Sequence, residues 1–509
     1  MRLGIDLGTT RTVVAVEDRG NYPVVGFLAG SGDLVEHYPS ISAEVGGKLV
    51  HGLEAVAAAR AGAPWLGSWK RLFSERGARA QVSIGTVTLS LADLTASFLS
   101  ALRHDLFTQS NLPKRFADPL EAVISVPANA HSTQRFLTLE AFRRAGFTVR
   151  GMLNEPSAAG LEYAHRYRDT INSRREHVVI YDLGGGTFDA AVVMIAGGQH
   201  DVLATSGIAR LGGDDFDEAL LEMALKKAGI TRAVTPTERG ALLLECRLVK
   251  EALNPNSRRL VIDLTALGED APEAPVVIPV GDYYERVRPL VLQSMEALEP
   301  VLAAETADAK GNGITDADLA GIYVVGGASG LPLVPRVLRE RFGRRVHRSP
   351  YPSAATAIGL AVAAERDEPV HVRERLTRHL GVFREGEGGA RISFDSIFAQ
   401  GTPMPAPGSS PMVVVRSYQA AHNLGHYRFI ECSALDASGG PCGDITPHAE
   451  IRCPFAPELR GRADLAETPV ERLPRDGPWI EERYEIDAGG IVTITITDRT
   501  DGYSQRCIL

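Results

Sequence analysis

The sequence contains few cysteines, and their spacing is not that of a disulfide scaffold or a structural zinc site. Only five cysteines occur in 509 residues, and none of them form the short Cys-x-x-Cys pairs that are typical of zinc-binding modules. Four of them lie with two histidines in the last quarter of the chain: His422, His426, Cys432, Cys442, Cys453 and Cys507. We predict reduced, mostly buried thiols, with a metal site as the open alternative.

An excess of positive charge is also lacking. The chain carries 54 Lys and Arg against 63 Asp and Glu, for a formal net charge of −9 and a pI near 5.9. Binding to nucleic acid or to an anionic membrane depends on clustered basic residues. We therefore expect neither partner, and we expect proteins or small molecules instead.

Long hydrophobic runs are missing as well. No uninterrupted apolar run approaches the ~20 residues that a helix needs to cross a bilayer. The first residues lead directly into a glycine-rich motif, which leaves no room for the regions of a secretory signal. From these two features we expect a cytoplasmic, soluble protein.

The length and the apolar content predict a globular protein with several domains. The chain has 509 residues and is 44% hydrophobic, which is enough to bury more than one core. A prior of roughly 150 residues per domain predicts about three units, some of them fused into larger lobes.

Two similar glycine-rich turns are the most informative feature of the chain. The first glycine turn covers residues 4–10 (Gly-Ile-Asp-Leu-Gly-Thr-Thr), and the second covers residues 182–189 (Asp-Leu-Gly-Gly-Gly-Thr-Phe-Asp) after an apolar strand. Glycines let backbone N–H groups close on an oxyanion, hydroxyls add donors, and an Asp at the strand end can hold a hydrated divalent cation. Two such turns facing each other would bind a nucleoside triphosphate from both sides.

Strands and helices alternate over the first 365 residues. Strand-like segments are residues 3–6, 12–16, 122–126, 178–181, 190–195 and 321–325. An apolar stripe from Leu91 to Leu106 predicts a helix, Ser132 is expected to cap another, and a capping box at Thr235 predicts a helix through Leu253. The alternation and the repeated turn predict an internally duplicated α/β architecture of two lobes, with the ligand in the cleft.

The composition changes after Ala364. Residues 366–379 form a charged stretch without an apolar period, which predicts a linker after an α/β domain at residues 1–365. From residue 380 the pattern is strand-rich, with strands at 412–415 and 427–432 and an alternating strand after a turn at 487–490. Residues 380–509 are therefore predicted to form a small all-β domain.

Three further segments complete a set of five in a fixed order. Residues 154–160 (Asn-Glu-Pro-Ser-Ala-Ala-Gly) and 353–359 (Ser-Ala-Ala-Thr-Ala-Ile-Gly) have the small residues of two hinge segments that cross closely at the base of a cleft. Residues 324–332 (Val-Val-Gly-Gly-Ala-Ser-Gly-Leu-Pro) fit a loop whose glycines approach a nucleoside. This is the order of segments that an actin-type ATPase lobe requires.

With these motifs the chain resembles the seventy-kilodalton heat-shock (DnaK-like) chaperones of the actin, hexokinase and heat-shock ATPase superfamily. The similarity is dense from Arg2 to Ala364 and thinner over residues 380–509. It implies an actin-like ATPase domain of duplicated ribonuclease-H-like units, then a β-sandwich peptide-binding domain without a helical lid. It also implies hydrolysis of ATP with Mg²⁺ and K⁺, extended unfolded polypeptide as client, and a J-domain co-chaperone and a nucleotide exchange factor as partners.

The resemblance assigns roles to individual residues. Asp6 and Asp182 would hold the metal, and the catalytic residues would be Lys70, Glu155, Asp182, Thr187 and Asp189. The nucleotide would be bound by Gly8, Thr9, Thr10, Gly184, Gly185, Gly186, Thr187, Gly212, Gly213, Lys250, Gly326 and Gly327. Pro127 and Arg135 would relay the nucleotide state, and Val413 and Val415 would line the peptide groove. Without the resemblance, Lys70 would be interpreted as a surface lysine, Glu155 as a carboxylate at the start of a helix, and the two valines as core residues.

Three departures from the family pattern change the expectations. Glu251 and Gly330 stand where long side chains flank the adenine, and Arg247 replaces a ribose-binding glutamate, which predicts weaker or less selective nucleotide binding. Residues 370–374 are a poor substitute for the aliphatic run of the family linker, which puts interdomain coupling in doubt. Without a lid, clients should be released quickly.

Two rivals stay open beside the ATP-dependent chaperone. The first is a nucleotide-sensing adaptor of the same fold that hydrolyses little ATP and binds one dedicated protein through its β domain. The second is a small-molecule kinase of the same superfamily, for which the form of the second glycine turn and the terminal β domain fit less well.

Overall fold

The computed structural model describes the chain except for residues 31, 74–79, 114–118, 168–170, 172–174, 197, 304–318, 366–370 and 475. The described residues divide into two compact units. Unit 1 consists of Met1–Asn129 and Leu137–Val372, and unit 2 of Ala130–Phe136 and Arg373–Leu509.

Unit 1 contains two large sheets with the same central arrangement. The first has the order β12-β11-β1-β2-β5 and the second the order β19-β18-β13-β14-β15-β20. In the first sheet β1 is antiparallel to β2 and parallel to β11, and in the second β13 is antiparallel to β14 and parallel to β18. The two hairpins carry the two glycine turns, so the predicted internal duplication is present in the fold.

Each predicted strand segment lies within an observed strand, which is longer than the prediction by one to three residues. The first sheet consists of β1 (Arg2–Leu7), β2 (Arg11–Val16), β5 (Tyr38–Pro39), β11 (Glu121–Val126) and β12 (Thr148–Asn154). The second consists of β13 (His177–Leu183), β14 (Phe188–Ala196), β15 (Gln199–Ile208), β18 (Leu319–Val325), β19 (Val346–Arg348) and β20 (His371–Arg373). Residues 371–373 of the predicted linker thus join an edge of the second sheet, which differs from the expectation of a poorly docking segment.

Two helices of small residues cover a face of each sheet. These helices are α5 (Glu155–Arg166) and α10 (Ala355–Ala363). Residues of both helices belong to hydrophobic clusters with strands of the first sheet and to a cluster with strands of the second. A Cβ atom on Gly359 would lie 1.7 Å from the carbonyl oxygen of Ala158, so only glycine allows this crossing. The predicted close approach of the two hinge segments is therefore confirmed.

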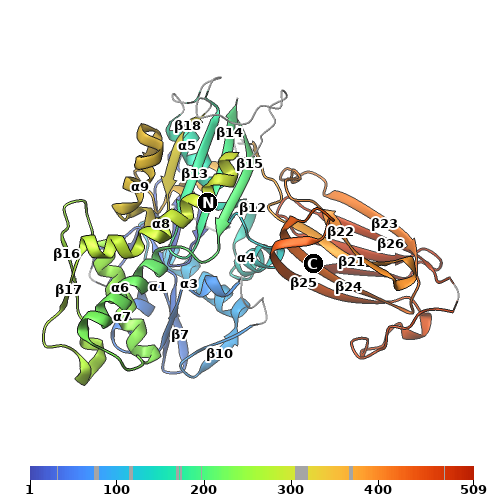
Figure 1. Ribbon diagram of the computed structural model, residues 1–509, viewed down its shortest axis with the longest axis horizontal. Helices are drawn as coiled ribbons and strands as arrows, with labels where there is room; N and C mark the ends of the chain where they lie inside the picture. The colour runs from blue at the N-terminus through green and yellow to red at the C-terminus, as the bar shows by residue number, and fades with distance from the viewer. Residues whose placement is uncertain are drawn as a thin grey trace. The chain divides into compact units, whose positions relative to one another are not determined.

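The opposite face of the second sheet packs against the largest hydrophobic cluster among the described residues. Its helices are α6 (Gly213–Ala228), α7 (Pro236–Glu251), α8 (Val280–Ala303) and α9 (Leu333–Phe342), which Figure 1 draws in green to yellow. Helix α7 begins with the predicted capping box, in which the Thr235 hydroxyl accepts from the Glu238 N–H and the Glu238 carboxylate from the Thr235 N–H. It ends at Glu251, slightly before the predicted Leu253.

Smaller elements complete unit 1. The helices are α1 (Gly52–Arg60), α3 (Leu91–Thr108) and α4 (Ser132–Arg144), of which α4 begins in the segment assigned to unit 2. The strands are β3 (Phe27–Leu28), β4 (Leu34–Val35), β6 (Ile41–Val45), β7 (Lys48–His51), β8 (Trp65–Gly67), β9 (Gln81–Ile84), β10 (Val87–Ser90), β16 (Arg259–Ile262) and β17 (Val276–Pro279). Ser132 is the first residue of α4, not the cap before it, and its hydroxyl donates to Glu431.

The strands of unit 2 form a sandwich of two antiparallel sheets around one core, drawn in orange to red in Figure 1. One sheet has the order β22 (Arg391–Phe398), β21 (His379–Gly386), β24 (Leu424–Leu435) and β25 (Pro441–Pro454). The other has the order β23 (Met412–Gln419), β26 (Trp479–Ile486), β27 (Val492–Asp498) and β28 (Ser504–Ile508). In β27 the buried Ile494 and Ile496 alternate with more exposed threonines, as the sequence predicts. The described residues after Arg373 contain no α-helix.

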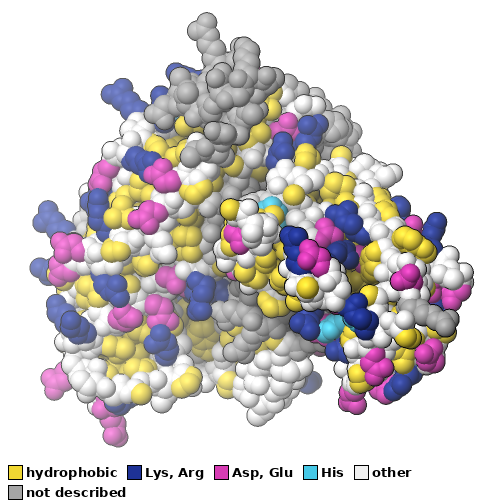
Figure 2. All heavy atoms as spheres, turned by 45° about the vertical axis from the view of Figure 1, so that its right-hand side comes forward, with side chains coloured by type: hydrophobic (Ala, Val, Ile, Leu, Met, Phe, Trp, Pro, Cys, Tyr) yellow, Lys and Arg dark blue, Asp and Glu magenta, His cyan; other side chains and the backbone are white. Residues whose placement is uncertain are grey.

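On the face shown in Figure 2, basic and acidic side chains are interspersed, with apolar side chains between them. The five cysteines are unpaired, and Cys246, Cys432 and Cys453 are buried. Among the described residues, no helix combines the length and the apolar character that a membrane span requires.

Candidate functional site

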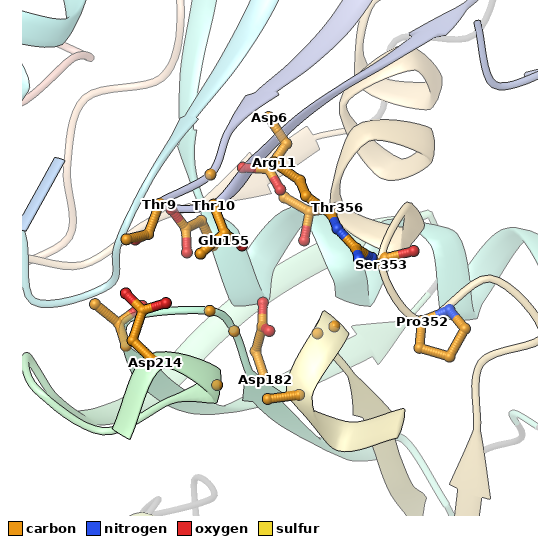
Figure 3. A pocket seen from close by; sticks show the side chains of 18 of the residues that line it. Asp6, Thr9, Thr10, Arg11, Glu155, Asp182, Asp214, Pro352, Ser353 and Thr356 are labelled. Carbon is orange, nitrogen blue, oxygen red and sulfur yellow. The ribbon is translucent and has the colours of Figure 1, made fainter. Parts of the chain in front are cut away.

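The two glycine turns face each other in unit 1. A Cβ atom on Gly185 would lie 2.4 Å from the Thr10 hydroxyl, and one on Gly186 would lie 2.7 Å from the Thr9 methyl group. Glycine is therefore required at both positions for the turns to approach so closely. Figure 3 shows Thr9 and Thr10 on one side of the cavity and Asp182 on the other.

The second turn is held by the start of α6. Within the turn, the Gly184 N–H donates to the Thr187 carbonyl at 2.9 Å. The carbonyls of Gly184 and Gly185 accept from the N–H groups of Gly213 and Asp214 at 3.0 and 2.8 Å. A Cβ atom on Gly212 would lie 2.7 Å from the Gly185 backbone, so this glycine too is required by close packing.

A cavity of about 90 Å³ lies between the turns. Its lining includes most of the predicted site: Asp6, Gly8, Thr9, Thr10, Lys70, Glu155, Asp182, Gly184, Gly185, Thr187, Gly213, Lys250, Gly326 and Gly327. The predicted residues Gly186, Gly212 and Asp189 lie directly behind this lining, where they contact Thr9, Gly185 and Ala128. The structure thus brings the predicted catalytic, nucleotide and metal residues into one place.

Buried carboxylates dominate the electrostatics of the cavity. Burial and the neighbouring Glu155 raise the pKa of Asp6 to about 6. Burial, then Glu155 and Asp189, raise the pKa of Asp182 well above its usual range. Burial and Glu155 also raise the pKa of Asp189 to about 7. Burial is the largest cause of all three shifts, and the negative charge of Glu155 adds to it.

Lys70 is the principal cation among them. It is only 8% exposed, and its ammonium donates to the Glu155 carboxylate at 2.8 Å. Burial alone would lower the pKa of Lys70, but Glu155 and Asp6 outweigh this and raise it. The surface-lysine interpretation of Lys70 is therefore wrong. Glu155 does begin α5, but it is also buried and paired, so both descriptions of it hold.

The end of β11 supports two of the carboxylates. The Ser125 hydroxyl donates to Asp6 at 2.7 Å, and the Ala128 N–H donates to Asp189 at 3.0 Å. Pro127, a predicted relay residue, lies between these two contacts in the chain. Sequence reasoning missed Ser125 because a serine on a strand carries no signal of its own.

Two arginines beside the second glycine turn and the cavity were also missed. Arg71 donates to the Gly186 carbonyl at 2.9 Å and pairs with Asp215 at 2.6 Å. Arg11 forms an ion pair with Glu251 at the end of α7. Both arginines directly follow predicted site residues, Lys70 and Thr10, and this adjacency was the available signal.

At the nucleoside end, Arg247, which departs from the family pattern, and Lys250 form a network of ion pairs with residues of α6. Arg247 pairs with Asp214 at 2.7 Å and with Asp217 at 3.2 Å. Lys250 donates to the Gly213 carbonyl at 2.7 Å and pairs with Asp217 at 2.6 Å. Lys250 is thus held against the start of α6, at the site where the sequence places it.

The remaining predicted residues lie in unit 2. Arg135 is buried in the short segment assigned to this unit, and its guanidinium donates to the Gly489 carbonyl at 3.5 Å. Val413 and Val415 are 37% and 43% exposed on β23. The core interpretation of these two valines is therefore wrong, and their role in peptide binding stays a prediction.

Comparison with known proteins decides the family. A family model described as Hsp70 protein matches residues 72–377, which is more than half of the chain. The chain belongs to the Hsp70 family. This confirms the predicted resemblance and the fold class, and it supports an ATP-binding chaperone of the Hsp70 type as the general function.

Two relatives show how far the similarity extends. "Heat shock 70 kDa protein BIP3" of Oryza sativa subsp. japonica is 27% identical over 536 residues, covering 99% of this chain and 74% of that protein. "Chaperone protein HscA homolog" of Verminephrobacter eiseniae (strain EF01-2) is 31% identical over 390 residues, covering 72% of this chain and 58% of that protein. The chain therefore spans less than two thirds of the length of the second relative.

Proposed function

We propose that this chain is an ATP-dependent chaperone that hydrolyses ATP between the two glycine turns and binds extended unfolded polypeptide through unit 2. The observation that carries the proposal is the cavity itself, in which both turns, the Lys70–Glu155 pair and the carboxylates of Asp6 and Asp182 meet. The proposal includes a J-domain co-chaperone and a nucleotide exchange factor as partners, and the cytoplasm as the location.

The carboxylates fit a hydrated Mg²⁺ ion. Burial and the neighbouring Glu155 disfavour the charged forms of Asp6 and Asp182, and a bound divalent cation would stabilise these charged forms. Mg²⁺ usually keeps several waters and is bound through one or two carboxylates plus substrate phosphates. Within the described ranges, no group of three or more His, Cys, Asp or Glu is arranged as a metal site, so water and phosphate would supply most ligands.

In hydrolysis of ATP, each group of the site would have its own role. When bound, Mg²⁺ would neutralise charge on the phosphates. Backbone N–H groups of both turns and the hydroxyls of Thr9, Thr10 and Thr187 would hold the phosphate oxygens. Lys70 would face the transferred phosphate, while Glu155 and Asp189 would orient the water. Phosphoryl transfer to water depends on this kind of positioning and charge neutralisation more than on covalent chemistry.

Single-turnover ATP hydrolysis by the purified chain with Mg²⁺ and K⁺ tests the proposal. We expect Thr187→Ala and Lys70→Ala each to lower the rate by at least about 100-fold, because each removes a preorganised group at the reacting phosphate. Lys48→Ala is the matched control, since Lys48 is exposed on β7. Wild-type turnover in either site variant, with an unchanged circular dichroism spectrum, would refute the assignment.

Client binding is the second part of the proposal. Unit 2 exposes apolar side chains from both sheets, including Val413, Val415, Phe383 and Ile392. Extended apolar peptides should therefore bind to the purified chain and accelerate hydrolysis. Residues 371–373 of the linker form the edge strand β20 of the second sheet, and we expect this strand to take part in communication between nucleotide and client.

The adaptor is the second candidate, and one observation favours it. At the nucleoside end, Arg11 and Glu251 bind each other, and Arg247 is held by two aspartates, so these side chains are already paired. Tight ATP binding without hydrolysis, with or without peptide, would favour the nucleotide-sensing adaptor over the ATPase.

A further inference from the structure

A second, larger cavity adjoins the nucleoside end of the site in unit 1. Its volume is about 840 Å³, compared with about 90 Å³ for the cavity between the turns. The two cavities share five lining residues: Arg11, Lys250, Glu251, Gly327 and Ala328. A ligand held between the turns can therefore extend into the larger space.

The walls of the larger cavity are strongly cationic. Among the described residues that line it, the basic ones are Arg11, Lys250, Arg336, Arg339 and Arg348, and the only carboxylate is that of Glu251. Glu251 is occupied by Arg11, and Lys250 by Asp217. The charge of the three arginines at positions 336, 339 and 348 is therefore not balanced within the cavity. We call these three residues, with Gly330, the arginine cavity.

Two of these guanidinium groups have no partner in the described part of the chain. Arg336 lies over the ring of Tyr284, 5.2 Å from its centroid. The side chains of Arg339 and Arg348 make no hydrogen bond or ion pair with any described residue. By comparison, Arg341 of the same helix pairs with Glu299. Among the described residues, the arginines at positions 339 and 348 therefore face the cavity without an acidic partner.

Gly330 explains why this space is open. A Cβ atom on Gly330 would lie 3.4 Å from the Nη2 atom of Arg348. The guanidinium of Arg348 therefore lies next to the glycine, in the volume that a longer side chain at position 330 would take. The loss of a side chain at this position and the presence of Arg348 together turn the nucleoside end into an anion-binding surface.

We propose that the arginine cavity binds a phosphate group attached to the ribose, so that the preferred ligand is a nucleotide phosphorylated on its ribose as well as at its 5′ end. This inference rests on the proposed function, because the 5′ phosphates must be held between the glycine turns. A phosphate dianion matches two guanidinium forks and can neutralise both at once. A plain nucleoside would leave Arg339 and Arg348 facing the bound ligand without a counter-charge.

Isothermal titration calorimetry of the full chain with Mg²⁺ tests the inference. The probes are ADP, ADP carrying a 3′-phosphate, ADP carrying a 2′-phosphate, and inorganic pyrophosphate added at saturating ADP. We expect one of the ribose-phosphorylated probes to bind about tenfold more tightly than ADP, as charge-assisted hydrogen bonds to a phosphate allow. Raising the salt concentration should reduce this gain, because the arginines are exposed.

Matched variants connect the gain to the arginine cavity. Arg339→Gln and Arg348→Gln together should abolish the tenfold gain and leave ADP affinity within about twofold. Gly330→Arg should also abolish it, by filling the cavity. Arg344→Gln is the control, since Arg344 is an exposed arginine of the same segment that does not line the cavity. Because Arg339 and Arg348 are exposed, their replacement should not change the melting temperature.

The outcomes separate this inference from the proposed function. If ADP binds but neither ribose phosphate tightens binding, the inference is wrong and the proposed function stands. If ADP does not bind at all, both the proposed function and this inference are wrong. If pyrophosphate binds beside ADP and the double variant abolishes that binding, the cavity serves a separate phosphate compound, and a single ribose-phosphorylated ligand is excluded.

Discussion

At the scale of single residues, the site depends on a few buried charges with specific partners. Lys70 stays protonated because Glu155 and Asp6 surround it, while burial and the neighbouring Glu155 raise the pKa of Asp6 to about 6. The cavity is therefore poised to receive a divalent cation and a polyanion together. A neutral ligand would leave this charge uncompensated.

The Arg11–Glu251 ion pair should slow nucleotide release. It joins the start of β2 to the end of α7 across the mouth of the cavity, between residues 240 positions apart. We expect Arg11→Gln to speed ADP dissociation about two- to fivefold, as fits a partly exposed ion pair. Stopped-flow measurements with a fluorescent ADP would check this.

A double-mutant cycle makes this prediction specific. Glu251→Gln should produce the same acceleration, and the double variant should be no faster than either single one. Additive effects of the two substitutions would show that each residue contacts the nucleotide independently.

At the scale of elements, the crossing of α5 and α10 is set by a single glycine. Gly359→Ala would place a methyl group within 1.7 Å of the Ala158 carbonyl, so the helices must separate. We expect a loss of roughly 1–3 kcal/mol in the free energy of unfolding, as for an overpacked core. Gly281→Ala is the control, because nothing lies within 4 Å of that position in α8. Hydrogen exchange in α5 and α10 should increase only in the first variant.

His51 makes the packing of α1 and α3 sensitive to acid. Its ring nitrogens lie 2.8 Å from the hydroxyls of Ser42 and Ser97, and burial lowers its pKa from 6.5 to about 4. Below pH 6.5 the unfolded chain therefore binds a proton at His51, whereas the folded chain binds this proton only below about pH 4. Stability should be full above pH 6.5 and fall by roughly 3 kcal/mol as the pH drops to 4.

Urea unfolding of unit 1 between pH 7.5 and pH 4 would measure this loss. Other buried histidines such as His200, whose pKa burial lowers to about 4, contribute in the same direction. The comparison of wild type with His51→Gln isolates the share of His51, since the variant should show a shallower dependence on pH. An identical slope in both proteins would contradict the assignment.

At the scale of the whole molecule, strand β20 within the linker is the element to test. Val372 in β20 packs against a core that includes Val123, Leu153 and Leu360. We expect Val372→Asp to detach β20 and to abolish the acceleration of hydrolysis by peptide, while basal hydrolysis stays within about twofold. Val372→Ile should keep the acceleration. Equal stimulation in the Asp variant would show that β20 takes no part in communication.

The local motifs of the site were predictable because each one lies within a few consecutive residues. The glycines, hydroxyls and Asp residues of both turns, the capping box at Thr235 and the small residues of α5 and α10 all follow from short-range geometry. The roles of Lys70 and Glu155, 85 positions apart, came only from the family resemblance. The contact of Ser125 with Asp6 carried no local signal and was missed.

By itself, then, the sequence determined the duplicated α/β architecture, the β-rich second unit and the phosphate end of the site, because periodicity and turn chemistry act over short stretches of chain. Only the tertiary structure decided that Arg11 meets Glu251, that Val413 and Val415 are exposed, and that Arg348 lies beside Gly330. These outcomes depend on which distant side chains share a cavity or a surface. That is set by the packing of whole sheets and helices, which no short stretch of sequence specifies.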